Sequence, residues 1–331
     1  MKNVLMKIMV LAIFVLFLPF ANARTFTDVP TNYWAYSAIN FVSDLGVMNG
    51  VSSTTFAPSS PATRASAAVT LVKAFNLPLN TTGGPHFTDV STTHWAYAYI
   101  ETLYNKGIST GCGNGKYCPD QAISRAQFTV LMVKSLGLTL TTSTRSSFPD
   151  VSTTHWAFKY IQTAQENGFV VGYTNGNFGP EDNALRDQLA VMLNRAIEAV
   201  YSFTDVPTNH WAYTPIVYVA ERGIMTGVNS TSFAPSQSLK RDAAAVVVVR
   251  ALGLTLNTTG GPHFTDVPTT HWAYAFIETL YNKGISSGCG NGKYCPDQAI
   301  SRAQFTVLMV KSLGLTLTTS TRSSFPDVST T

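Results

Sequence analysis

Charged side chains are scarce in this 331-residue sequence, in which Asp, Glu, Lys and Arg together make up 12% of the residues. Ser, Thr, Asn and Gly take their place, a composition that suits an exported protein better than a cytosolic enzyme. The net charge is only +4, and no cluster of Lys or Arg occurs along the chain. Because nucleic-acid binding relies on such a basic cluster, we exclude nucleic acid as a partner.

Long apolar runs are also missing, except near the start of the chain. Residues 8–20 form an uncharged apolar run after two lysines, and it is shorter than the ~20 residues that a membrane-spanning helix needs. An Ala-Asn-Ala tripeptide then fits the small-residue pattern of signal-peptide cleavage. We predict a signal peptide over residues 1–23, a mature chain beginning at Arg24 with a net charge of about +2, and no membrane span after cleavage. An uncleaved anchor is the alternative.

The sequence has only four cysteines, in two copies of the heptapeptide Cys-Gly-Asn-Gly-Lys-Tyr-Cys that begin at Cys112 and Cys289. Export permits disulfides, and four cysteines allow three pairings. We predict the local pairs Cys112–Cys118 and Cys289–Cys295, because each copy contains its own partner and the bond would pin a Gly-rich loop. A metal site is the alternative, but the spacing differs from the usual CxxC pattern and no His lies nearby. We therefore expect no metal and no cofactor.

Catalytic signatures are absent as well. The sequence contains no Gly-x-Ser-x-Gly, no His-Glu-x-x-His and no phosphate-binding loop. Six of the 18 acidic residues belong to one repeated motif, and the others are scattered without a recognisable pair. We predict no catalytic residue and no enzymatic activity in this chain.

What the sequence does contain is a repeat. The tetrapeptide Phe-x-Asp-Val occurs six times, at steps of 61, 61, 55, 61 and 61 residues, and such a fixed period marks a repeat array. In each complete unit a Trp follows the motif, and an Arg follows that Trp by 30 residues. The acids are Asp28, Asp89, Asp150, Asp205 and Asp266; the tryptophans are Trp34, Trp95, Trp156, Trp211 and Trp272; the arginines are Arg64, Arg125, Arg186, Arg241 and Arg302.

A longer period is superimposed on the first. Residues 79–154 and 256–331 are identical at 73 of 76 positions, and their offset of 177 residues equals three units. The array is therefore organised in threes. We place repeats 1 to 5 at residues 24–86, 87–147, 148–202, 203–263 and 264–324, and the start of a sixth at 325–331. Because this sixth unit ends before its first helix, we interpret the chain as a fragment or a truncated reading frame.

The second repeat illustrates the expected structure of one unit. Apolar residues recur at helical spacing from Trp95 to Tyr104, and glycines follow that predict the end of a first helix. Ser124 and Gln127 fit a capping box at the start of a second helix, which Gly137 ends. Two short helices bury too little surface alone, so neighbouring units must share a core.

The ordered landmarks are Phe-x-Asp-Val-x-x-x-His-Trp-Ala, Gly-Ile/Val-x-x-Gly, Phe-x-Pro and Ser/Thr-Arg-Ala. Over residues 26–315 they resemble the S-layer homology domain. The resemblance implies a mainly α fold of tandem helix-loop-helix repeats, grouped in threes as pseudo-three-fold helical bundles. It also implies a secreted protein of the cell wall or cell surface. Such a protein is anchored non-covalently, in the manner of an S-layer, by binding acidic, often pyruvylated, cell-wall polysaccharide or another peptidoglycan-linked polymer.

The family places the Arg of a Thr-Arg-Ala-Glu motif in its polysaccharide-binding groove, which implies that role for the five repeated arginines. This chain departs from the motif, because the Glu is replaced in every repeat. Leu185 and Lys240 also replace the Thr, which predicts weaker helix caps in repeats 3 and 4. The replacements of the Glu are Ser66, Gln127, Gln188, Ala243 and Gln304.

All fifteen repeated Arg, Trp and Asp residues are candidates for polysaccharide binding, and each has an alternative. The Arg could complete an anion site with the free amides of the second helix, or pair with a nearby acid. We favour the anion site. For the Trp we favour a packing anchor over a sugar platform. For the Asp we favour a cap or a loop brace over a calcium ligand. The histidines before the last four tryptophans are predicted to be structural.

Two other functions compete with wall anchoring. The repeats could belong to an exported enzyme whose catalytic domain is missing from this chain. They could also form a protein–protein adhesion array that binds a partner or self-assembles.

Overall fold

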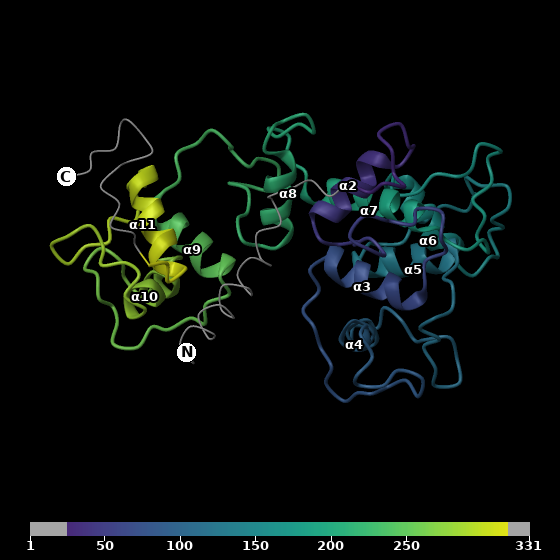
Figure 1. Cartoon of the computed structure of the whole chain (residues 1–331), viewed down its shortest axis with the longest axis horizontal. Coiled ribbons are helices and arrows are strands. Elements are labelled where there is room, and N and C mark those ends of the chain that lie inside the picture. Colours follow the sequence, from purple (N-terminus) through teal and green to yellow (C-terminus); the bar gives the residue numbers. More distant parts are fainter. Residues whose placement is uncertain (1–24, 317–331) are drawn as a thin grey trace. The chain divides into compact units, whose positions relative to one another are not determined.

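The computed structural model describes residues 25–316, so the predicted signal peptide and the start of the sixth repeat lie outside the described residues (Figure 1). The described part holds ten α-helices, and its only extended pairings are isolated bridges, which confirms the mainly α prediction. None of these helices is long and apolar enough to cross a membrane. The helices are α2 (Tyr36–Asp44), α3 (Arg64–Ala74), α4 (Tyr97–Asn105), α5 (Arg125–Ser135), α6 (Phe158–Glu166), α7 (Arg186–Tyr201), α8 (Tyr213–Glu221), α9 (Arg241–Ala251), α10 (Tyr274–Asn282) and α11 (Arg302–Ser312).

Each complete repeat contributes two helices, the first of which begins two residues after the repeated Trp. In repeat 2 a turn precedes α4, and Nδ1 of His94 accepts the Ala96 amide at 3.1 Å. The same contact recurs at the other three histidines, which confirms their structural role. The second helix, α5, begins with the predicted capping box between Ser124 and Gln127. It ends before Gly137, whose positive φ of 62° favours glycine.

Repeats 3 and 4 lack a side-chain cap from Leu185 and Lys240, as predicted. An aspartate two positions further on makes up for the loss. Oδ1 of Asp187 accepts the amide of the next residue at 2.7 Å, and Oδ1 of Asp242 does the same at 2.6 Å. A carboxylate in the first turn also complements the helix dipole, so these two helices start stably without a Ser or Thr.

The chain divides into two compact units, Met1–Arg222 and Gly223–Thr331. In the first unit, the second helix of one repeat packs on the first helix of the next, as in the pairs α3/α4 and α5/α6. Helix α2 packs on α7, which links repeat 1 to repeat 3, and α8 contacts α7 as well (Figure 1). In the second unit α9 packs on both α10 and α11. Neighbouring repeats therefore share their cores.

A ring of backbone hydrogen bonds joins repeats 1, 2 and 3. The amide of Ala62 donates to the carbonyl of Ala184, Ala184 donates to Ile123, and Ile123 donates back to Ala62, each at 2.9 Å. In the second unit Ile300 donates to Leu239 at 2.9 Å, which is the same contact between repeats 4 and 5. The grouping into pseudo-three-fold bundles stays a prediction, and the ring in the first unit supports it.

Candidate functional site: the grooves between repeats

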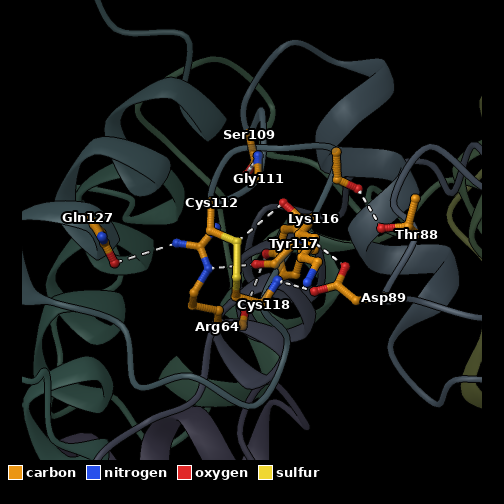
Figure 2. The surroundings of a disulfide bond; sticks show 11 residues. Arg64, Thr88, Asp89, Ser109, Gly111, Cys112, Lys116, Tyr117, Cys118 and Gln127 are labelled. Atoms are coloured by element: carbon orange, nitrogen blue, oxygen red, sulfur yellow. Dashed lines mark hydrogen bonds between the residues drawn. A yellow bond between two sulfur atoms is a disulfide. The ribbon is translucent and has the colours of Figure 1, made fainter.

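The loop between the two helices of a repeat forms one wall of the groove in repeats 1, 3 and 4, and carries the two disulfides in repeats 2 and 5. Both predicted disulfides are present in it, and each joins cysteines whose Cα atoms lie 6.0 Å apart. Figure 2 shows the bond between Cys112 and Cys118 beside Asp89 and Arg64. The disulfide thus closes the Gly-rich loop of repeat 2 next to two of the repeated residues.

The repeated Asp braces this loop. In repeat 2 the carboxylate of Asp89 accepts the amides of Tyr117 and Cys118, both at 2.8 Å (Figure 2). Burial alone would raise the pKa of Asp89, but these two hydrogen bonds outweigh it and lower the pKa below its usual value. Asp28, Asp150 and Asp266 bind the equivalent amides, so the predicted loop brace is confirmed in four repeats.

In repeats 1 to 4 the repeated Arg joins its repeat to a neighbouring one. Nε of Arg64 donates to the carbonyl of Tyr117, 53 residues away, at 2.8 Å (Figure 2). Equivalent bonds of 2.8 or 2.9 Å are made by Arg125, Arg186 and Arg241. Arg64 and Arg125 are only 4% and 3% exposed. These arginines are inter-repeat clamps whose main partner is a carbonyl, not the acid of the alternative interpretation.

The predicted anion site at the free amides of the second helix is wrong. At the start of α3 the amides of Arg64 and Ala65 donate to carbonyls of repeat 2, and the amide of Ser66 donates to Oγ1 of Thr63. Repeats 2, 3 and 4 are built in the same way. Because the neighbouring repeat and the cap take the first three amides, the helix start offers a ligand no free donor there.

The prediction that the repeated Trp is a packing anchor is also wrong. Trp34, Trp95, Trp156 and Trp272 are between 56 and 63% exposed, and Trp211 is 90% exposed. The first helix begins after the Trp, so the ring does not lie on the buried helical face. The alanine that follows fills the core instead, and in repeat 2 this residue, Ala96, is fully buried. Exposed indoles are free to contact a ligand.

Three repeats build each of the two grooves of the first unit. In the groove of repeat 1, of about 160 Å³, the wall comes from Asn49 and Lys73 of repeat 1, Trp95 of repeat 2 and Arg186 of repeat 3. We call this the repeat-1 groove. Its counterpart of about 370 Å³, the repeat-3 groove, is lined by residues of repeat 3 together with Trp34 of repeat 1 and Arg125 of repeat 2. The ring of repeats thus brings together an Arg and a Trp that lie far apart in the sequence.

The second unit contains a larger groove between repeats 4 and 5, the repeat-4 groove, of about 630 Å³. Trp272 and His271 of repeat 5 line it, together with Lys240, Asp242 and Arg250 of repeat 4. Arg241 is a buried clamp and is not among the lining residues. The arginines and tryptophans therefore do not all contribute to these three grooves in the same way.

Two sets of groove residues escaped the sequence analysis. A basic residue follows every repeated Arg by nine positions, and that fixed spacing was the available signal. Three of these residues line the grooves just described, namely Lys73, Arg195 and Arg250. The other two are Lys134 and Lys311.

The second set consists of Asp187 and Asp242, which directly follow the repeated Arg. Oδ2 of Asp187 accepts the indole N–H of Trp34 at 3.2 Å, and Oδ2 of Asp242 accepts that of Trp272 at 3.0 Å. Asp187 also accepts the hydroxyl of Tyr33 at 2.7 Å. Burial, assisted by this bond, raises the pKa of Tyr33.

The family model of the S-layer homology domain matches residues 25–68, 86–129, 147–190, 202–245 and 263–306. The chain belongs to the S-layer homology family. It is 33% identical to an endoglucanase of a Bacillus species over 175 residues, which are 49% of this chain and 18% of that protein. It is 33% identical to a cellulosome-anchoring protein of Acetivibrio thermocellus over 174 residues, 49% of this chain and 39% of that protein. An S-layer protein of Bacillus licheniformis is 31% identical over 176 residues, 51% of this chain and 19% of that protein.

The matching region of this S-layer homology chain spans less than half the length of these relatives. The family and the names of the relatives support a location at the cell wall or cell surface.

Proposed function

We propose that this chain anchors an exported protein non-covalently to the bacterial cell wall by binding acidic wall polysaccharide in the grooves between its repeats. Pyruvylated glycan, or another peptidoglycan-linked polymer with carboxylates, is the ligand that we expect. The observation that carries the proposal is the repeat-1 groove, where the positive side chains of Arg186 and Lys73 lie with the exposed ring of Trp95.

The guanidinium in this groove is held in place before any ligand arrives. Arg186 donates from Nε to the carbonyl of Phe56 at 2.9 Å and from Nη2 to that of Asn49 at 2.6 Å. Burial lowers the pKa of Arg186 from its usual value, but an arginine stays charged at neutral pH. Because the side chain is already ordered, binding a carboxylate costs little further conformational entropy.

The other two groove residues complement this fixed charge. Nζ of Lys73 lies 3.3 Å from the carbonyl of Gly46 and can supply a second positive charge to the same ligand. The indole of Trp95 offers an apolar face to the apolar face of a sugar ring. Two cations and one indole form a site for a sugar that bears a carboxylate.

The relatives favour an anchoring role over an enzymatic one. The S-layer homology repeats occur in an S-layer protein, in a cellulosome-anchoring protein and in an endoglucanase. The endoglucanase shares only 18% of its length with this chain. We infer that the repeats bind the wall, and that the protein they hold there differs from case to case.

A sedimentation assay with purified, protein-free sacculi tests the proposal. The mature chain is compared with the double variant Lys73→Ala/Trp95→Ala, which truncates two side chains that line the repeat-1 groove. The control is Lys106→Ala, which removes an exposed charge elsewhere. We expect the wild type and Lys106→Ala to sediment with the wall and the double variant to be bound several-fold less. Free wall polysaccharide should release the bound protein.

The result that would overturn the proposal is a folded wild type that stays in solution with sacculi, or one whose sedimentation does not respond to free polysaccharide. Protein–protein adhesion or self-assembly would then be the better explanation. The buried clamps Arg64 and Arg125 are left unchanged, because their loss would disturb the fold and a loss of binding would have two causes.

A further inference from the structure

One of the positions at which the repeats differ is the residue directly after the repeated Arg. Repeats 1, 2 and 5 have alanine there, whereas repeats 3 and 4 have Asp187 and Asp242. This position lies at the first turn of the second helix, beside the Trp of the next repeat in the ring. The side chain found there therefore decides whether a carboxylate lies against that Trp.

In the repeat-3 groove the aspartate is buried beneath the tryptophan. Asp187 is only 3% exposed and accepts three hydrogen bonds, from the Gln188 amide, the Tyr33 hydroxyl and the Trp34 indole. All three donors are neutral, so the negative charge is held in place but not cancelled by a bound cation. A fixed carboxylate thus lies directly beneath Trp34, while the charged residues that line this groove itself are Arg125 and Arg195.

The repeat-4 groove repeats the arrangement with other neighbours. Asp242 is 4% exposed and binds the amide of Ala243 and the indole of Trp272. Nε2 of His271 lies 3.9 Å from the same carboxylate. The lining also holds Asp297, whose Oδ1 lies 2.8 Å from Nζ of Lys240. Two acids therefore accompany the two positive side chains of this groove, Lys240 and Arg250.

The repeat-1 groove has no acid in this place. Ala65 offers no acceptor to the indole of Trp95, and the helix is capped by the neutral hydroxyl of Thr63. The lining contains Lys73 and Arg186 and no acidic residue. Repeat 2 has the same composition at the equivalent positions, with Ala126 after the Arg and Ser124 as the cap.

We propose that the residue after the repeated Arg selects the charge of the sugar that each groove accepts. This inference rests on the proposed function. Grooves with alanine there bind a sugar that bears a carboxylate, whereas the aspartate of repeats 3 and 4 repels it. Like charges close together in a partly buried site oppose each other strongly, because the surrounding protein screens them less than water does. The array is thus a set of two kinds of site rather than several equal ones.

Each of the three grooves is lined by one tryptophan, so NMR can observe the grooves separately. Each indole N–H of the ¹⁵N-labelled mature chain gives one signal, which Trp→Phe variants assign. The probes are the methyl glycoside of an N-acetylhexosamine with a 4,6-pyruvate ketal and the same glycoside without it. We expect the anionic probe to shift the signal of Trp95, and to leave those of Trp34 and Trp272 in place.

Substitution of the residue after the repeated Arg provides the matched variants. Asp187→Asn removes the charge and keeps one acceptor oxygen, which can serve either the helix amide or the indole, so Trp34 should now respond to the anionic probe with at least tenfold higher affinity. Ala65→Asp should weaken the response of Trp95 at least tenfold. Neither variant should change the response to the uncharged probe. A purely structural role of the aspartate would change the responses to both probes alike.

Three results would overturn the inference. The first is a wild-type Trp34 that responds to the anionic probe as strongly as Trp95, and the second is an Asp187→Asn variant in which Trp34 stays unresponsive. The third is a chain that sediments with sacculi while no indole responds to either probe; the proposed function then stands without the charge selection. If the folded chain neither sediments nor responds, the proposed function itself fails.

Discussion

Helices α5 and α11 have the same eleven-residue sequence in different surroundings, which allows a sharp test of the arginine clamp. Arg125 at the start of α5 is 3% exposed, whereas Arg302 at the start of α11 is exposed. Arg125 donates to the carbonyl of Phe178 at 2.8 Å and to that of Val171 at 3.2 Å. We predict that Arg125→Ala destabilises the first unit and that Arg302→Ala has almost no effect.

The magnitude follows from the bonds that are lost. A hydrogen bond from a charged donor contributes about 1.5 to 3 kcal/mol, and truncation also leaves two carbonyls without this partner. The guanidinium of Arg125 lies 4.7 Å from the ring centres of both Tyr173 and Phe178, and these contacts are lost too. We estimate a loss of about 3 kcal/mol for Arg125→Ala, and less than about 0.5 kcal/mol for the exposed Arg302→Ala.

Hydrogen exchange measured by mass spectrometry can locate the effect in the full chain. The amides of Ile123 and Ala184 belong to the ring that joins repeats 1 to 3, so their exchange reports the opening of that ring. A loss of about 3 kcal/mol corresponds to exchange that is roughly 100-fold faster. Exchange in Gly223–Thr331 should stay unchanged in Arg125→Ala, and Arg302→Ala serves as the sequence-matched control.

Two results would refute this reasoning. If Arg302→Ala accelerated exchange as much as Arg125→Ala, the sequence of the helix rather than the clamp would set the effect. If Arg125→Ala accelerated exchange of the ring amides less than threefold, the carbonyl bonds would contribute little to stability. In that case a ligand-binding role would remain the better reason for an Arg at this position.

Three further predictions concern the loop, its brace and α8. Replacing Cys112 and Cys118 with serine should cost about 2 kcal/mol, because the short loop regains chain entropy on unfolding, and urea titration measures this. Asp89→Ala should lower the free energy of unfolding by about 2 kcal/mol at neutral pH, because two amides lose their partner. Folding lowers the pKa of Asp89, so protonation below pH 3.8 should remove this contribution in the wild type, whereas the variant should not show this pH dependence. Burial, opposed by Arg222, raises the pKa of Glu221 to about 7, so stability should fall by about 3 kcal/mol as the pH rises from 4.5 to 7. Glu221→Gln should flatten that slope in urea unfolding curves.

Much of one repeat could be predicted because its determinants are local. The helix pair follows from apolar spacing, the capping box of α5 from Ser124 and Gln127, and the disulfide of Cys112 from its partner six residues away. The loop brace by Asp89 was predicted as well, since a short acid before a helix has few other roles. These features need no knowledge of how the repeats meet.

The errors arose where one repeat contacts another. The carbonyl that Arg64 binds belongs to the next repeat, and no residue type in the sequence marks a backbone acceptor. For the same reason the sequence did not reveal that neighbouring carbonyls occupy the first amides of α3. The exposure of the Trp was predicted wrongly because the apolar spacing places the start of the first helix at Trp95, two residues before its observed start at Tyr97. Asp187 and the basic residues such as Lys73 are visible in the sequence, but their neighbours are not. The structure places Asp187 against Trp34, and Lys73 in one groove with Trp95 and Arg186.

The same geometry ties stability and binding together. The repeat-1 groove takes Lys73 from repeat 1, Trp95 from repeat 2 and Arg186 from repeat 3, so an isolated repeat contains no such groove. Arg186 both lines the groove and clamps the loop of repeat 1 through the carbonyls of Phe56 and Asn49. Loss of wall binding on replacing this Arg therefore does not by itself demonstrate a ligand contact. Lys73 and Trp95 carry that test, because Lys73 donates to Gly46 of its own repeat and Trp95 is exposed.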